Sequence, residues 1–142
     1  MATVNVYLTF NGNTEEAFNF YKSVFGGEFT YMGRFKDMPA DENCPPPSEE
    51  EGNRIMHVSL PISKETILMA SDSTSFSGDV TFGNNFSVSI NTDNKEEADR
   101  LFNGLSVGGN IIMPMEKTFW GAYFGMFTDK FGVNWMVNLD EV

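Results

Sequence analysis

Residues 4–27, VNVYLTFNGNTEEAFNFYKSVFGG, contain the pattern that decides the fold. The first seven of them alternate between apolar and polar side chains, which is typical of a strand with one face on a core. A helix is expected next, because Asn13 or Thr14 can cap its first turn and the glycine pair at 26–27 can end it. The stretch therefore predicts a strand that leads directly into an amphipathic helix.

Residues 86–109, FSVSINTDNKEEADRLFNGLSVGG, repeat this order, with Asp93 or Asn94 as the expected helix cap. Each copy precedes three strand-like runs, which are 28–35, 54–62 and 66–72 in the first half and 110–118, 122–129 and 134–139 in the second. The sequence thus predicts one α+β domain, residues 1–142, built from two βαβββ modules at about 1–76 and 82–142. The Ser-, Gly- and Asn-rich segment 71–85 is the expected linker.

Charge and composition argue against several kinds of partner and of structural site. The 20 acidic and 9 basic side chains give a formal charge of −11, which repels a polyphosphate backbone, so nucleic acid is not an expected partner. Cys44 is the single cysteine, which excludes an internal disulfide and a multi-thiolate zinc site. The start lacks a signal-peptide pattern and no run of about eighteen apolar residues occurs, so we expect a cytoplasmic protein without a membrane partner.

Residues 117–135, KTFWGAYFGMFTDKFGVNW, gather aromatic residues and glycines near the end of the chain. Gly125 inside a strand pattern indicates a bulge or a close approach to the backbone. The DKFG segment indicates a hairpin turn, in which Asp129 bonds its own backbone and Gly132 takes a positive φ.

With GNTEEAFNFYKSVFGGEF (12–29), IMHVSL (55–60) and ILMASD (67–72), this aromatic stretch resembles the vicinal oxygen chelate superfamily. More narrowly, the chain looks like the PhnB-like branch of the glyoxalase and bleomycin-resistance proteins. Lys130 and Val133 depart from the motif, where proline and histidine are usual. The resemblance implies a curved mixed sheet around a cavity, with the helices on its outer side, and a homodimer.

Metal-dependent members of the superfamily hold a divalent ion with His and Asp or Glu from both modules. The corresponding positions here fall near Asn5 or Val6, within 68–70, and at Asn85 and Met136, and none is histidine or a carboxylate. Amides and a thioether do not offset the dehydration of such an ion. No superfamily-type metal and no other cofactor are predicted, and a divalent metal at another position stays an open alternative.

The residues expected to contact a ligand come from both modules. Strand alternation turns Tyr7, Asn85 and Met136 away from the helices, and Trp120 is either a packed aromatic or a cavity wall. We expect His57 on the same strand face as Ile55 and Ser59.

His57 and Asp72 are the two candidate catalytic residues. His57 is either a hydrogen-bonded sheet histidine or a group that contacts ligand or transfers protons. Asp72 is either a strand-end carboxylate or a partner that orients His57.

Two functions follow as hypotheses. The first is binding of a small organic ligand in the cavity, without chemistry. The alternative is a lyase-, isomerase- or dioxygenase-type enzyme on a small oxygenated substrate, with His57 as acid/base or metal ligand. A methyltransferase, a label sometimes attached to PhnB-like sequences, is not expected, because no strand leads through a Gly-rich turn into a helix with an acidic ribose ligand beyond it.

Overall fold

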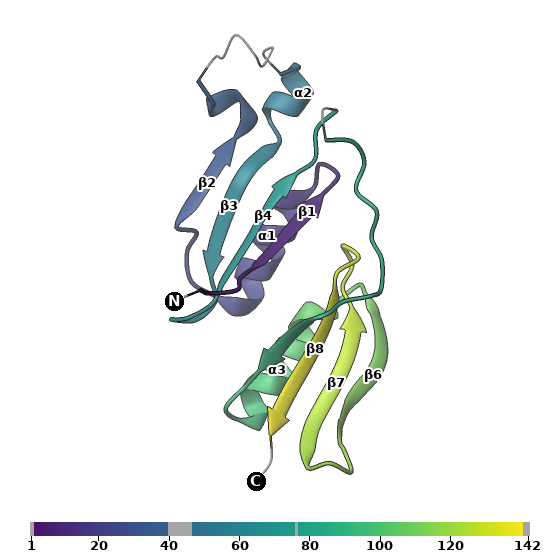
Figure 1. Ribbon diagram of the computed structural model, residues 1–142. Helices are drawn as coiled ribbons and strands as arrows, with labels where there is room; N and C mark the ends of the chain where they lie inside the picture. The colour runs from purple at the N-terminus through teal and green to yellow at the C-terminus, as the bar shows by residue number, and fades with distance from the viewer. Residues whose placement is uncertain (1, 40–46, 76, 141–142) are drawn as a thin grey trace. The chain divides into compact units, whose positions relative to one another are not determined.

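The computed structural model describes residues 2–39, 47–75 and 77–140 (Figure 1). They form two compact units, residues 1–81 and 82–142, and the division falls inside the expected linker 71–85. No helix among the described residues is long and apolar enough to cross a membrane. Cys44 lies outside the described residues.

Unit 1 contains one four-stranded mixed sheet with a helix on one face. Its elements are β1 (Val6–Phe10), α1 (Thr14–Phe25), β2 (Tyr31–Arg34), the 3-10 helix η1 (Phe35–Asp37), the short α2 (Glu49–Gly52), β3 (Ile55–Pro61) and β4 (Ile67–Asp72). The strand order is β1-β4-β3-β2, with β1 parallel to β4 and the other pairs antiparallel. Helix α1 covers one face of this sheet (Figure 1).

Unit 2 repeats the same topology. Its elements are β5 (Val88–Asn91), α3 (Lys95–Leu105), β6 (Asn110–Lys117), β7 (Ala122–Thr128) and β8 (Asn134–Asp140), in the order β5-β8-β7-β6. Helix α3 is capped by Asn94, whose side chain accepts a hydrogen bond from the backbone N–H of Glu97 at 2.8 Å. The α+β class with two βαβββ modules is therefore confirmed, and a single cavity shared by both modules stays a prediction.

Strand alternation and one helix form the core of each unit, as predicted for Leu8 and Phe10, whereas Val4 and Phe86 of the predicted apolar faces are exposed. The core of unit 1 consists of apolar side chains between the sheet and α1, namely Leu8, Phe10, Ala17, Phe18, Tyr21, Ile55, Val58, Leu60, Leu68 and Ala70. Unit 2 is built in the same way around the fully buried Trp135, with Leu101, Phe102, Leu105, Phe127 and Val137. Each sheet has a second face, opposite its helix, whose side chains do not belong to this core.

A β-bulge in β3 corrects one expectation. Gly33 pairs with His57, whereas the next residue, Arg34, pairs with Ile55, so Met56 is an extra residue in β3. Because a bulge shifts the alternation by one residue, Ile55 is buried, only 1% exposed, and does not share a face with His57 and Ser59. The prediction for Ile55 was therefore wrong.

The turn after β7 is confirmed. Asp129 is buried, and its Oδ1 accepts hydrogen bonds from the backbone N–H groups of Phe131 and Val133 at 2.8 and 3.1 Å. Its other oxygen accepts the indole N–H of Trp135 at 2.8 Å. Gly132 has φ of +93°. The Asp129 carboxylate thus joins the turn to the centre of the core of unit 2.

Gly125 allows a close approach inside unit 2. A Cβ atom at this position would lie 2.7 Å from the sulfur of Met115 and 2.7 Å from the ring of Phe102. The predicted close approach is therefore confirmed.

The Tyr123 hydroxyl makes the stability of unit 2 depend on pH. It donates a 2.6 Å hydrogen bond to Asp99 on α3, and Lys95 lies 3.0 Å from the same carboxylate. The Tyr123 hydrogen bond, and then Lys95, hold the pKa of Asp99 below its ordinary value. A carboxylate with a lowered pKa contributes stability above its unfolded-state pKa, and this contribution is lost as the pH falls through the lower, folded-state pKa.

We therefore expect Tyr123→Phe to raise the pKa of Asp99 toward the ordinary carboxyl value, measured by carboxyl-carbon NMR titration. The stability difference between wild type and variant should be largest near neutral pH and shrink in acid. An unchanged Asp99 titration in the variant would contradict this assignment.

Candidate functional site

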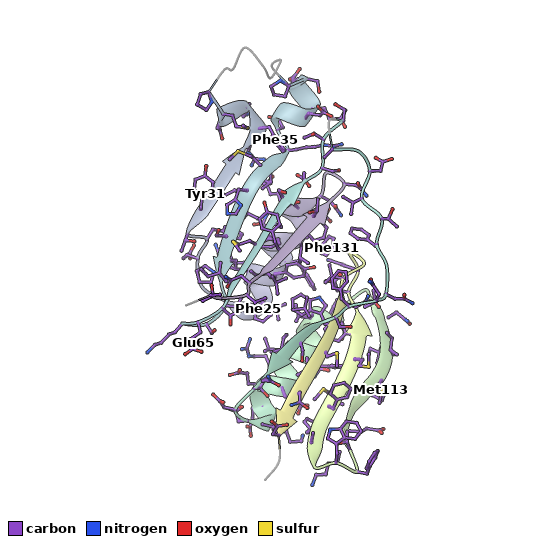
Figure 2. All side chains as sticks on the ribbon, viewed as in Figure 1. Phe25, Tyr31, Phe35, Glu65, Met113 and Phe131 are labelled. Carbon is purple, nitrogen blue, oxygen red and sulfur yellow. The ribbon has the colours of Figure 1, made fainter. Side chains whose placement is uncertain are left out.

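A row of side chains crosses the face of the unit 1 sheet opposite α1, here named the outer face of unit 1. In the predicted fold this helix-free face is the one expected to line the cavity. Tyr7 on β1 pairs with Met69 on β4, Met69 pairs with Ser59 on β3, and Ser59 pairs with Tyr31 on β2. Tyr31 projects from β2 in Figure 2. Because paired residues of neighbouring strands point to the same side of a sheet, these four side chains lie next to one another.

His57 lies at the centre of the outer face. Its Nδ1 is 3.3 Å from the hydroxyl of Tyr7, and its Nε2 is 2.9 Å from the hydroxyl of Ser59. The ring centroids of Tyr7 and Tyr31 are 5.7 and 5.8 Å from that of His57. The imidazole therefore lies between two tyrosine rings, each of which is about half exposed.

Gly33 leaves room for Tyr31. A Cβ atom at Gly33 would lie 2.6 Å from the hydroxyl oxygen of Tyr31, so the phenol extends over this glycine. Gly33 is the cross-strand partner of His57, which places the Tyr31 hydroxyl beside the imidazole. The missing side chain at residue 33 thus lets Tyr31 lie on the sheet.

The arrangement joins flat apolar surface to groups that donate and accept hydrogen bonds. A hydroxyl can donate or accept, so Tyr7 and Ser59 are compatible with either tautomer of His57. The outer face of unit 1 can therefore bind a planar compound through stacking and orient its oxygen atoms through hydrogen bonds.

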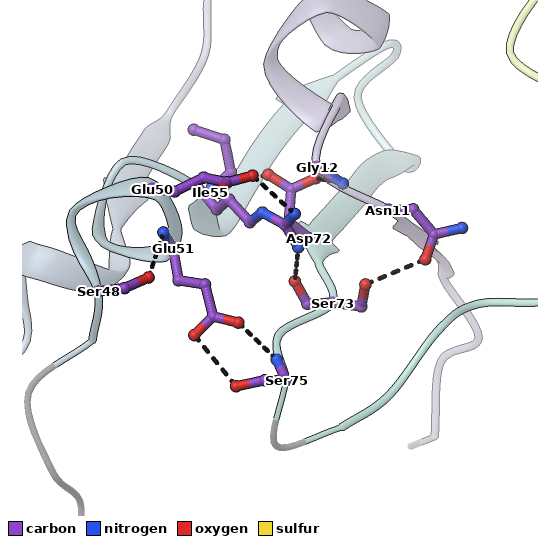
Figure 3. Close-up of polar contacts among 10 residues, drawn as sticks. Asn11, Gly12, Ser48, Glu50, Glu51, Ile55, Asp72, Ser73 and Ser75 are labelled. Atoms are coloured by element: carbon purple, nitrogen blue, oxygen red, sulfur yellow. Dashed lines mark hydrogen bonds and ion pairs between the residues drawn. The ribbon is translucent and has the colours of Figure 1, made fainter.

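Asp72 has a different place in the structure. It is buried on the helix side of the sheet, between Gly12 and Ile55 (Figure 3). Its Oδ1 accepts the backbone N–H groups of Gly12 and Thr14, both at 3.0 Å, and the hydroxyl of Thr14 at 2.6 Å. Its Oδ2 accepts the N–H of Ile55 at 2.8 Å. Asp72 thus caps α1, where the side chain of Asn13 makes no capping bond.

Asp72 therefore does not orient His57. The two ring nitrogens of His57 have the hydroxyls of Tyr7 and Ser59 as partners. The sequence contained a signal for this outcome. Asp72 has the same strand parity as Leu68 and Ala70, which are buried, whereas His57 lies on the opposite face.

On unit 2, the sheet face opposite α3, here the outer face of unit 2, has a different chemistry. Ser89 pairs with Met136, Met136 with Met126, and Met126 with Met113, so three thioethers follow one another across β8, β7 and β6. Met136 is half-buried, and Met113 projects from β6 in Figure 2. Asn85 is exposed and precedes β5.

Trp120 lies in the turn between β6 and β7 and is 58% exposed. Its indole ring meets Phe119 and Phe124 edge-on, with centroids 5.0 and 6.2 Å away. It is therefore not a core residue of unit 2, and its surface is open to contact.

Metal-binding donors do not gather in the described parts of the chain, residues 2–39, 47–75 and 77–140, where no three His, Cys, Asp or Glu side chains come together. The superfamily-type positions Asn85 and Met136 offer an amide and a thioether. This donor set does not fit a divalent ion that needs imidazole and carboxylate.

Two residues of the outer face of unit 1 were missed by the sequence analysis as functional candidates, Ser59 and Tyr31. Ser59 could have been found, because it follows His57 by two residues on one strand and so shares its face. Tyr31 could not, because its position depends on the pairing of β2 with β3 and on the space above Gly33.

A family model described as 3-demethylubiquinone-9 3-methyltransferase matches residues 2–138. The chain belongs to this family. YjdN of Escherichia coli K12 is 34% identical, with 94% of this chain and 92% of that protein covered. PA1353 of Pseudomonas aeruginosa is 41% identical over the whole of both chains, with a TM-score of 0.84.

A structure from Bacillus cereus, described as a putative 3-demethylubiquinone-9 3-methyltransferase, PhnB protein, is 28% identical with a TM-score of 0.72. It covers 97% of this chain and 99% of its own. A glyoxylase/bleomycin resistance protein/dioxygenase domain from Frankia, 12% identical, shares the fold, with a TM-score of 0.69. The predicted PhnB-like branch is confirmed, and the fold is the one found in the glyoxalase and bleomycin-resistance proteins.

We expect Asp72→Asn to lower the free energy of unfolding by about 3 kcal/mol, because an amide cannot accept all the hydrogen bonds that the buried carboxylate receives. Urea unfolding, together with hydrogen exchange of the β3 and β4 amides, measures the loss. Asp79→Asn is the matched control, since Asp79 is exposed and its change should stay within about 0.5 kcal/mol. Equal effects of the two variants would contradict a capping role for Asp72.

Proposed function

We propose that this protein binds a small, oxygen-bearing aromatic compound on the outer face of unit 1, without a superfamily-type divalent metal. The observation that carries the proposal is the cluster of Tyr7, His57 and Tyr31, in which both tyrosine rings are tilted against the imidazole and Ser59 lies beside it. Stacking of one aromatic pair contributes about 0.5–1.5 kcal/mol beyond the area it buries. The three hydroxyls and the imidazole then select compounds with oxygen atoms at the ring edge.

A metal-free mode of binding is supported by the chemistry of the donors. His57, the single histidine of the chain, already has hydroxyl partners at both ring nitrogens. The superfamily-type positions offer the weak ligands Asn85 and Met136. On unit 2, considered by itself, Met136 and Trp120, with their apolar surfaces, and Asn85 are proposed as ligand-contacting residues.

An enzymatic role is the second candidate, as a lyase, isomerase or dioxygenase-type catalyst on a small oxygenated substrate. The observation that favours it is the hydroxyl partner at each ring nitrogen of His57, because such an imidazole can pass a proton from one side to the other.

Methyl transfer, which the family description names, is not part of this proposal. Helix α1 begins at the buried Asp72 carboxylate, and α3 begins at the side-chain cap of Asn94. A nucleoside cofactor on a Rossmann-type turn uses the free N–H groups of such a helix start. In both units a side chain of the protein accepts one of these N–H groups, that of Thr14 in α1 and that of Glu97 in α3.

Homodimer formation and a cytoplasmic location remain part of the proposal. The resemblance supports the first, and the acidic composition is compatible with the second. Sedimentation equilibrium tests the homodimer directly. A monomer mass at all protein concentrations would contradict it.

Catechol is a suitable probe of the outer face of unit 1, because it is planar and has two neighbouring oxygens. We expect amide and ring resonances of Tyr7, His57 and Tyr31 to shift on titration with catechol in the presence of EDTA. Tyr31→Ala should weaken the Kd about 5- to 10-fold, the factor expected from the loss of about 1–1.4 kcal/mol of stacking.

Met38→Ala is the matched control, since Met38 and Tyr31 are each 49% exposed in unit 1. Met38→Ala should leave the Kd unchanged. Loss of catechol binding in EDTA, or equal Kd values for wild type and Tyr31→Ala, would contradict the proposal.

A further inference from the structure

We infer that Ser59 is a nucleophile with His57 as its general base, so that the outer face of unit 1 can accept an acyl group from a small ester and hydrolyse it. The inference rests on the proposed function in one respect, since the ester must bind on the same face. It assigns a covalent reaction to a residue, Ser59, that binding alone does not require.

The distances fit a nucleophile, a base and an orienting group. The hydroxyl of Ser59 lies 2.9 Å from Nε2 of His57, within reach of proton transfer. On the other side of the ring, Nδ1 lies 3.3 Å from the hydroxyl of Tyr7. When Nδ1–H donates to the Tyr7 oxygen, Nε2 carries the lone pair that accepts the Ser59 proton.

The backbone holds this pair in place from both sides. Ser59 and His57 lie on β3, an inner strand, and Ser59 is paired with Met69 on β4 and with Tyr31 on β2. Functional groups on paired strands keep their geometry better than groups on loops. Tyr7 comes from β1 and approaches the imidazole from the far edge of the sheet.

Tyr31 can supply the group that stabilises developing negative charge. Its hydroxyl lies over Gly33, the partner of His57, while its own backbone partner is Ser59. The Tyr31 hydroxyl thus lies on the His57 side of Ser59, and in this inference the carbonyl oxygen of the bound ester points toward it. Such a donor stabilises the oxyanion of the tetrahedral intermediate.

The reaction balances without any other reagent than water. The Ser59 oxygen bonds to the acyl carbon and its proton moves to Nε2 of His57. The bond from the acyl carbon to the leaving oxygen then breaks, and His57 returns the proton to that oxygen. In the second half His57 takes a proton from water, the resulting hydroxide attacks the acyl-serine, and the proton returns to Ser59 as the carboxylic acid leaves.

Incubation of the full chain with p-nitrophenyl acetate tests the inference. We expect a burst of p-nitrophenolate and one acetyl group on the peptide that contains Ser59, detected by mass spectrometry. Ser59→Ala should abolish both, and His57→Gln should slow the burst about 100- to 10,000-fold, the range for loss of a general base. Ser71→Ala is the matched control, since Ser71 is a half-buried serine on the same face, and should retain the burst.

Three further variants test Tyr7 as a positioning residue and Tyr31 as the oxyanion donor. Tyr7→Phe should lower kcat about 2- to 10-fold, by a larger factor than it changes KM, as expected for one lost hydrogen bond to the base. Tyr31→Phe should lower kcat about 100-fold if its hydroxyl stabilises the oxyanion. Gly33→Ala should have a similar effect, because the added methyl group displaces the end of the exposed Tyr31 side chain.

The ketone p-nitroacetophenone, which cannot acylate a serine, separates this inference from the binding proposal. Shifts of the Tyr31 and His57 resonances with the ketone, but no acetyl on Ser59 with the ester, would overturn the nucleophile and leave binding intact. The assignment of Ser59 as the nucleophile would also be overturned if Ser59→Ala gave an unchanged burst and was acetylated at other residues. Absence of both shifts and burst would remove the inference together with the proposed function.

Discussion

The buried carboxylate of Asp72 is the contact on which the arrangement of unit 1 depends. It receives backbone N–H groups from the start of α1 and from the start of β3, while its own strand, β4, pairs with β1 and β3. An unpaired carboxylate on the core side would be costly, so these donors are fixed around it. The consequence is a sheet with one face closed by α1, which leaves His57 and its neighbours on the other.

The two units show how one topology carries two chemistries. By strand register, His57 of unit 1 corresponds to Phe124 of unit 2, and Ser59 corresponds to Met126. The core positions in both units remain apolar because they must pack against a helix. The positions on the outer faces do not pack against a helix, so their side chains can differ. The outer face of unit 1 has a histidine with hydroxyls, and that of unit 2 has a row of thioethers.

The paired strands hold the side chains of the outer face of unit 1 in fixed positions, which favours both binding and reaction. Cross-strand pairing fixes Tyr31, Ser59, Met69 and Tyr7 in one row, so little order has to be created when a ligand arrives. His57 gains its two hydrogen bonds from β1 and from its own strand. The site is thus a product of sheet geometry, with the bulge at Met56 marking where alternation changes.

The sequence by itself determined the repeated strand-helix-strand order, the turn at Asp129 with Gly132, and the sides of β1 and β8 that face a helix, because these depend on local periodicity and turn chemistry. It also indicated His57 and Tyr7 as candidate lining residues of a cavity, without predicting that they contact one another. Tertiary structure alone decided that Asp72 caps α1, that a bulge turns Ile55 into the core, and that Tyr31 lies over Gly33 beside His57. Each of these three features is a contact between residues on different elements. Strand register and packing determine such contacts, and no local sequence pattern encodes them.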